Sequence, residues 1–125
     1  MKHSLDDNRP IYHQIKEHIE DSIISEAIGT GERVPSTNEF ASFFKINPAT
    51  AAKGVNELVD EGILVKRRGV GMFVTEDARS ILIQKRKDSF FKSYVIPLRD
   101  EAKKLQITET ELLDMIQKGG EISED

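Results

Sequence analysis

The sequence lacks cysteine, long apolar runs and any excess of positive charge. Without cysteine, the chain can form neither disulfides nor thiolate metal sites. No run approaches the roughly 18 apolar residues of a membrane-spanning helix, so we expect no membrane span. Residues 1–4 lead into Asp6, Asp7 and Asn8 without an apolar stretch, which predicts no signal peptide and a cytoplasmic protein.

The net charge of −4 argues against a protein that coats nucleic acid nonspecifically, because such a protein needs a basic surface. Sequence-specific binding stays open, since it depends on where the cations lie. Several cations gather in one short stretch of the chain: Lys45, Lys53, Lys66, Arg67 and Arg68. They form either a DNA-binding surface or an ordinary solvated face.

The first predicted helix covers residues 10–28. Its isoleucines recur at steps of three and four residues, and Pro10 suits the first helical turn. A Gly-Thr-Gly sequence ends the helix. Pro35 disfavours helical geometry at the residue before it, so a short extended piece follows at residues 32–35.

Two further helices follow closely on each other. Ser36 and Glu39 form a capping box that opens a short helix to about residue 44. Asn47 caps the next helix, with Pro48 in its first turn, and that helix runs to about residue 61. Its predicted core stripe consists of Ala51, Val55, Leu58 and Val59.

A β-hairpin is predicted after the third helix. Residues 63–67 and 72–75 are apolar runs on either side of a glycine-bearing turn, which is typical of paired antiparallel strands. The order of helix, short helix, helix and hairpin indicates a winged helix-turn-helix. The predicted fold class is therefore mainly α with a small β-hairpin.

The rest of the chain has a helical period. Pro97 is expected to kink or break the long helix that begins near residue 78. Thr108 and Glu111 form a second capping box that opens a last helix. We predict three regions: a DNA-binding domain at 1–76, a helical dimerisation or effector region at 77–120, and a disordered acidic tail at 121–125.

A helix-turn-helix places its second helix in the major groove, with the N-terminal residues nearest the bases. The outer face of that helix is small, polar and cationic near its start, with Ala49 and Lys53 four residues apart. The start of the preceding helix is a second candidate, as a phosphate anchor. These two helix starts supply the following candidate DNA-binding residues: Ser36, Thr37, Asn38, Asn47, Pro48, Ala49, Thr50 and Lys53. The alternative is that they only cap helices or carry solvated charge.

The hairpin turn supplies the remaining candidates. A slim cationic tip can enter the minor groove, where narrow A·T tracts attract arginine. The candidates at this tip are Arg67, Arg68, Gly69 and Gly71. The alternative is an ordinary turn whose edge charges deter aggregation.

Four sequence pieces occur here in a recognisable order: PIYHQI from Pro10, GERVPS from Gly31, ELVDEGIL from Glu57 and RRGVGMFV from Arg67. With these pieces, the sequence resembles the GntR family of bacterial regulators. Asn47-Pro48-Ala49-Thr50 resembles the helix start typical of the YtrA-like subfamily. The resemblance implies a winged helix, a helical dimerisation unit and, usually, repression.

The chain departs from the family pattern at a few positions. Family members commonly carry arginine where this chain has Asn38, and the subfamily often has asparagine where this chain has Ala49. Where the subfamily often has an aromatic residue, this chain has Val55. The operator sequence therefore does not follow from the resemblance.

A homodimer is predicted because one side of the tail is too apolar for an isolated helix. That side carries Phe90, Phe91, Tyr94, Leu98 and Leu105. The alternative is that this side folds back onto its own winged helix. The partners expected are double-stranded operator DNA, a second copy of the chain and an unidentified small-molecule effector.

Other functions are less well supported by the sequence. An enzyme would need a nucleophile–base pair, a carboxylate pair or a metal cluster, and the three histidines (His3, His13 and His18) are not arranged for one. We therefore predict no catalytic residue, metal or cofactor. A winged helix can also serve as a protein–protein interaction module, and salt-sensitive DNA binding would discriminate the two.

Overall fold

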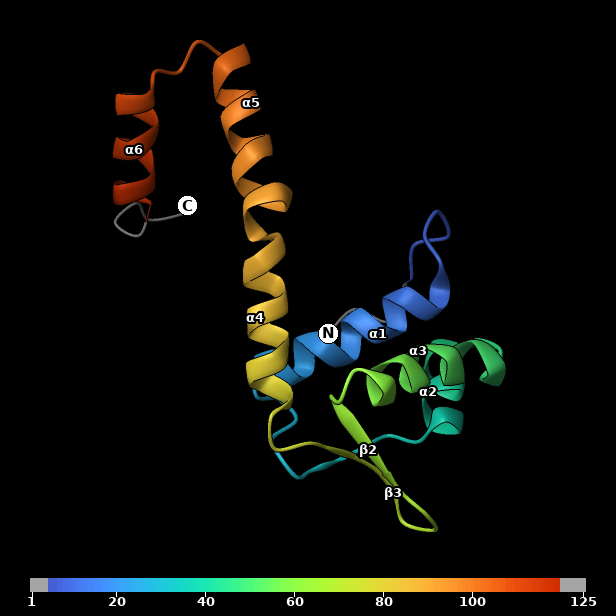
Figure 1. Cartoon of the computed structure of the whole chain (residues 1–125). Coiled ribbons are helices and arrows are strands. Elements are labelled where there is room, and N and C mark those ends of the chain that lie inside the picture. The colour runs from blue at the N-terminus through green and yellow to red at the C-terminus, as the bar shows by residue number, and fades with distance from the viewer. Residues whose placement is uncertain (1–4, 120–125) are drawn as a thin grey trace. The chain divides into compact units, whose positions relative to one another are not determined.

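The computed structural model describes residues 5–119, so the acidic tail expected at residues 121–125 lies outside the described part (Figure 1). The chain divides into two compact units, with the division between Lys85 and Arg86. The domain boundary expected after residue 76 stays a prediction. The first unit extends beyond it because Ala78 and Leu82 are fully buried in the same core as the helices before them.

Helix α1 (Ile11–Ile24) is shorter than the sequence predicts, because it ends four residues before residue 28. Pro10 precedes the helix and does not lie within it. The backbone of Glu26 adopts a left-handed conformation with φ of 65°, which ends the helix. Ile28 still packs against the core after this turn, so the apolar period continues past the true end of the helix.

Helices α2 (Thr37–Phe44) and α3 (Pro48–Asp60) begin as predicted. The Glu39 N–H donates to Ser36 Oγ over 3.0 Å, and the Ser36 N–H donates to Glu39 Oε1 over 2.8 Å. Asn47 Oδ1 accepts from the Ala49 N–H over 2.7 Å. Lys45, with φ of 56°, forms the tight turn between the helices. The inner face of α3 belongs to the core through Ala51, Val55 and Leu58, all 0% exposed.

The structure contains a three-stranded antiparallel sheet of order β1-β3-β2, where the sequence predicted a two-stranded hairpin. The hairpin strands are β2 (Leu64–Arg67) and β3 (Gly71–Val74). The expected extended piece is β1 (Arg33–Val34), and it pairs with β3 in the register Arg33 with Phe73. Local patterning reveals that a segment is extended but not which distant strand it joins.

Helix α4 (Ala78–Phe90) begins in the first unit. Leu82 is 0% exposed there. Lys85 Nζ donates to Glu20 on α1 over 2.9 Å and to Glu61 at the end of α3 over 3.2 Å. Lys16 on α1 also donates to Glu61, so Glu61 joins cations from two helices. This ion cluster ties α1, α3 and α4 together.

The second unit continues with a π-helical turn η1 (Phe91–Val95), helix α5 (Ile96–Lys104) and helix α6 (Glu109–Lys118). Pro97 lies in the first turn of α5, directly after η1. The prediction of a kink or break is therefore realised as a π turn, a local widening that relieves the clash of a proline ring with the preceding turn. The capping box at Thr108 is confirmed, since Glu111 N–H donates to its Oγ1 over 3.1 Å.

Candidate DNA-binding surface

The start of α3 presents a small, open surface. Asn47, Pro48 and Ala49 are exposed, and Thr50 is half-buried. Because the Asn47 side chain already accepts the Ala49 N–H, its capping role is established whatever else it contacts. The short side chains of Pro48 and Ala49 leave the helix start accessible to a duplex.

Lys53 lies one turn further along α3 and is exposed. Its Nζ stands 4.0 Å from the centre of the Tyr12 ring, at the start of α1. The sequence singled out Lys53 but not Tyr12, because the two are 41 residues apart and only the packing of α1 against α3 brings them together. Lys53 is thus a cation with a defined neighbour, and that neighbour is an aromatic ring.

The start of α2 is built around its cap. The backbone N–H of Ser36 holds the pKa of Glu39 below its usual value, so the capping carboxylate stays charged. The Ser36 hydroxyl accepts from the Glu39 N–H, which leaves Thr37 and Asn38 as the side chains for any outside contact. Asn38 is exposed and Thr37 is half-buried.

The wing is the turn between β2 and β3, and the hairpin projects from the first unit in Figure 1. Arg67 and Arg68 are exposed at its base, and the Arg67 guanidinium carbon lies 4.7 Å from the centre of the Phe73 ring. Gly69 has φ of 76° and no atom near its missing Cβ, as a tight open turn requires. Gly71 is half-buried beside Arg33.

Arg33 is a cation of this region that the sequence did not single out. Its Nε donates to the Val70 carbonyl in the wing turn over 3.4 Å, and its NH2 group lies 3.6 Å from Glu39 of the α2 cap. Arg33 therefore connects the wing with the helix-turn-helix. No local pattern predicts this, because it depends on the pairing of β1 with β3.

The five cations of residues 45–68 share one electrostatic property. Within residues 5–119, none of them forms an ion pair with a carboxylate, and all are exposed. By contrast, Lys16 and Lys85 are neutralised by Glu20, Glu57 and Glu61. The chain is acidic overall, yet its positive charge has no carboxylate partner on α3, in the turn before it and at the wing.

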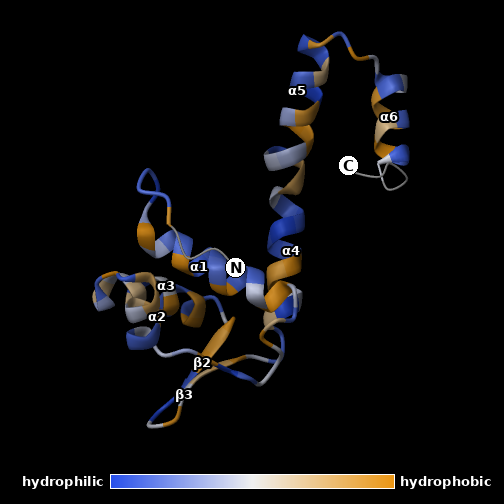
Figure 2. Ribbon diagram, turned by 180° about the vertical axis from the view of Figure 1, so that it is seen from behind, coloured by the Kyte–Doolittle hydropathy of each residue, from blue (hydrophilic) through white to orange (hydrophobic). Residues whose placement is uncertain are grey.

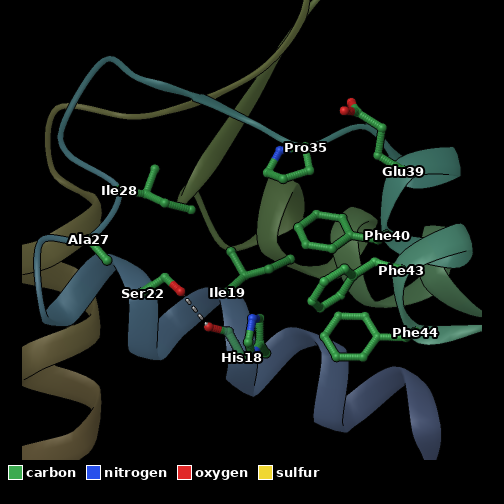
Figure 3. A pocket seen from close by; sticks show the side chains of 10 residues that line it. All are labelled: His18, Ile19, Ser22, Ala27, Ile28, Pro35, Glu39, Phe40, Phe43 and Phe44. Atoms are coloured by element: carbon green, nitrogen blue, oxygen red, sulfur yellow. Dashed lines mark hydrogen bonds between the residues drawn. The ribbon is translucent and has the colours of Figure 1, made fainter. Parts of the chain in front are cut away.

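An apolar pocket of about 470 Å³ lies between α1 and α2, under the loop that follows α1 (Figure 3). Its walls include the rings of His18, Phe40, Phe43 and Phe44, with the Ser22 hydroxyl bonded to the His18 carbonyl over 3.1 Å. None of the candidate DNA-binding residues lines it. The pocket is therefore separate in its residues from the candidate DNA-binding surface.

The side chains predicted for dimerisation are all uncovered in the structure. Phe90, Phe91, Tyr94, Leu98 and Leu105 are between 44% and 66% exposed. Figure 2 shows further hydrophobic stretches along α5 and α6. Three more large apolar side chains on α6 are over half exposed and were not among the predicted contacts: Leu113, Met115 and Ile116. Helical spacing within α6 is the signal that could have found Leu113 and Ile116.

Two other classes of site are absent from the described residues. No three histidine or carboxylate side chains of residues 5–119 gather as metal ligands would. No helix in this range is long and apolar enough to span a bilayer.

Comparison with known families decides what kind of protein carries this surface. Residues 11–74, from the start of α1 to the end of β3, match the gntR family of bacterial regulatory proteins. The chain belongs to this family. The resemblance predicted from the sequence is thereby confirmed, and so is the prediction of a transcriptional regulator and not an enzyme.

Two relatives of the chain come from Bacillus subtilis. The HTH-type regulator YhcF is 29% identical over 116 residues, which cover 93% of this chain and 94% of YhcF. The repressor YtrA is 33% identical over 75 residues, which cover 60% of this chain and 58% of YtrA. The match with YhcF therefore includes both units, whereas the match with YtrA covers little more than half of either chain.

Solved structures confirm the fold class. A GntR-family regulator from Listeria monocytogenes superposes with a TM-score of 0.72 at 29% identity, covering 91% of this chain and 98% of that one. The DNA-binding domain of AraR, solved in complex with operator DNA, superposes with a TM-score of 0.52 at 30% identity, covering 60% and 92%. The first unit therefore has the winged helix-turn-helix fold of a DNA-binding domain.

Proposed function

We propose that this GntR-family regulator binds a two-fold operator as a homodimer in the cytoplasm and represses transcription there. The observation that carries the proposal is the set of exposed, unpaired cations at α3 and the wing. A phosphate backbone attracts such cations and releases its own counterions on binding. Lysines already paired with carboxylates would contribute far less.

The dimer rests on the uncovered apolar side of the tail. Large side chains such as Tyr94 and Leu105 are over 60% exposed, and a contiguous patch of this kind is expected to be covered by a partner. A second copy of the chain is the partner we propose, because one winged helix contacts only a few base pairs. Two copies related by a two-fold axis would bind a palindromic site.

Repression is proposed by analogy with the relatives. YtrA is named as a transcriptional repressor, and so is the histidine utilization repressor of Klebsiella aerogenes, which is 37% identical over 67 residues. A protein that occupies an operator tightly can block polymerase without further machinery. The small residues at the start of α3 favour such close binding.

The proposal is tested by selecting bound duplexes from a random DNA pool with the full chain. We expect an inverted repeat whose half-sites lie about 10 base pairs, or a multiple of that, apart. Retention should weaken steeply with salt. A pool that yields no enriched sequence, or binding that ignores salt, would leave the protein–protein interaction module as the better hypothesis.

The small-molecule effector stays a prediction. The tail was the expected place for it, but the pocket beside Phe43 in the first unit is the better-formed cavity. Its apolar and aromatic walls favour a largely apolar molecule with a flat ring. Indole is a suitable probe, and a shift in the melting temperature that Ser22→Leu abolishes would support this location.

A further inference from the structure

The contact between Lys53 and Tyr12 joins α3 to the start of α1. Lys53 is exposed, so its long side chain could extend freely into water, yet its Nζ lies 4.0 Å from the centre of the Tyr12 ring. An ammonium group at this distance is attracted by the negative face of the ring. Tyr12 itself is half-buried and therefore offers a fixed platform.

The backbone holds this platform in place. Gly54, next to Lys53, is buried against α1, and a Cβ at that position would stand 2.6 Å from the Tyr12 carbonyl oxygen. Only glycine allows α1 and α3 to approach so closely there. The ring of Tyr12 thus lies beside Lys53 because the two backbones touch at the neighbouring residue.

A second contact between α1 and α3, an ion pair, lies one helical turn further along both helices. Lys16, four residues after Tyr12, donates from Nζ to Glu57, four residues after Lys53, over 3.2 Å. Lys16 is only 6% exposed, so this pair fixes how α1 and α3 align along their length. The Tyr12–Lys53 contact therefore lies at the solvent-exposed start of two helices whose alignment is fixed by the Lys16–Glu57 pair.

We infer that Tyr12 is a positioning residue of the DNA-binding surface, and that its ring holds the Lys53 ammonium for a backbone phosphate. This inference rests on the proposed function. A ring attracts a cation without neutralising it, so Lys53 keeps its full charge, whereas Lys16 and Lys85 are paired with carboxylates. The ordering of a flexible side chain before DNA arrives lowers the entropy cost of the contact.

The direction of the contact favours phosphate over a base edge. Bases are contacted from the first turn of a recognition helix, which here carries Ala49 and Thr50. Lys53 lies a turn later, and its ammonium is drawn towards α1, a helix that does not enter the groove. A phosphate contact positions the protein and carries no direct sequence information.

The test compares five versions of the full chain: wild type, Tyr12→Phe, Tyr12→Leu, Lys53→Ala and, as a control, Lys87→Ala, which removes an exposed lysine of the second unit and should leave DNA affinity near wild type. Phenylalanine keeps the ring, whereas leucine keeps only apolar bulk. Affinity is measured on the selected operator and on a scrambled duplex. We expect Tyr12→Leu to weaken both about two- to fivefold per half-site, and Tyr12→Phe to stay near wild type.

Coupling decides whether Tyr12 acts through Lys53. In a Lys53→Ala background, the Tyr12→Leu change should have no further effect on DNA affinity. A second readout needs no DNA: ring current should shift the Lys53 side-chain Hε proton resonances upfield in wild type and Tyr12→Phe, and the shift should vanish in Tyr12→Leu. A merely structural role for Tyr12 would produce neither the coupling nor this pattern.

Several results would overturn the inference. Additive losses in the double variant, an equal loss from Tyr12→Phe, or a loss from Lys53→Ala confined to the operator would each contradict it. The proposed function fails in a different way, since the wild-type chain would then retain no DNA in the selection.

Discussion

The two units of the chain differ most in what they bury. Residues 5–85 enclose a core to which every helix and strand of that unit contributes, with Ile15, Leu58 and Leu82 fully buried. Among residues 86–119, only Ala102 is buried. The first unit therefore has the interior of an independent domain, whereas the second has the apolar surface of an incomplete one.

The two units also use apolar side chains differently. In the first unit, most large apolar residues of α1, α3 and the sheet are buried, although Phe43, Val65 and Val70 are exposed. In the second, Phe91 and Tyr94 in η1 and Leu113 and Ile116 in α6 are exposed although they are large. This contrast supports the proposal that a partner covers the tail, whereas the winged helix encloses a core of its own.

The largest effect we expect is on the free energy of unfolding, and it separates a buried leucine of the first unit from an exposed leucine of the second. Leu58→Ala should lower the free energy of unfolding by about 2–5 kcal/mol, because it opens a cavity in the packed core. Leu113→Ala, at a site 53% exposed, should lower it by about 0.5 kcal/mol or less when measured at low protein concentration. Urea unfolding of both variants checks this, and equal losses would refute the contrast between the units.

The next strongest effect concerns the apolar side of the tail. Tyr94→Glu should raise the dissociation constant of the proposed dimer about 30-fold or more, because its two-fold interface would then bury one carboxylate from each copy. Lys92→Glu, an exposed position in the same π turn, serves as the matched control and should have little effect. Sedimentation equilibrium measures both. A dimer that tolerates Tyr94→Glu would place the interface elsewhere.

A smaller effect tests the ion cluster of the first unit by pH. Burial alone raises the pKa of Glu61, but hydrogen bonds from Lys16 and Lys85 outweigh it and hold the pKa below the ordinary 4.5. A carboxylate with a lowered folded pKa stabilises the fold above its unfolded value, and this stabilisation is lost as pH falls through the folded pKa. The same contacts raise the pKa of Lys16 against the opposing effect of burial, so that lysine stays charged throughout.

We therefore expect the free energy of unfolding to be steady from about pH 7 to about pH 5 and to fall below about pH 4.5. In Glu61→Gln the fall should be shallower, and the loss at neutral pH should be about 1 kcal/mol or less because the carboxylate is partly exposed. Urea titrations at several pH values measure both curves. Identical slopes in the two proteins would contradict this role for Glu61.

The smallest effect on stability is expected from a substitution in the wing. Arg68→Ala should change the free energy of unfolding by about 0.5 kcal/mol or less, yet it should weaken binding to many duplexes alike. The salt dependence of binding should flatten by about one unit for each phosphate that the arginine no longer neutralises. Lys87→Ala, an exposed cation in the second unit, is the control. Equal losses of affinity from both variants would show that general charge, and not the wing, drives binding.

Local signals in the sequence predicted much of this fold correctly. The capping boxes at Ser36 and Thr108 and the Asn47-Pro48 start of α3 depend on residues three or fewer positions apart, and the structure confirms all of them. The hairpin was equally local. Such signals are reliable because the hydrogen bonds that stabilise them close within one turn of chain.

Features that depend on distant residues were missed. The pairing of Arg33 with Phe73, the bridge from Lys85 to Glu20 and the contact of Lys53 with Tyr12 each join segments about 40 or more residues apart. The same holds for the candidate site. The helical period of the sequence predicted which side of α3 is exposed. It could not predict which cations lack a carboxylate partner, because that depends on how the helices pack.

In the proposed complex, two winged helices bind one DNA site and are held together by their tails. Sedimentation velocity of the full chain with the selected duplex gives the number of chains bound per duplex. We expect two chains per inverted repeat in wild type, and only one in Tyr94→Glu at the same protein concentration. A single wild-type chain per duplex at saturation would contradict the proposal.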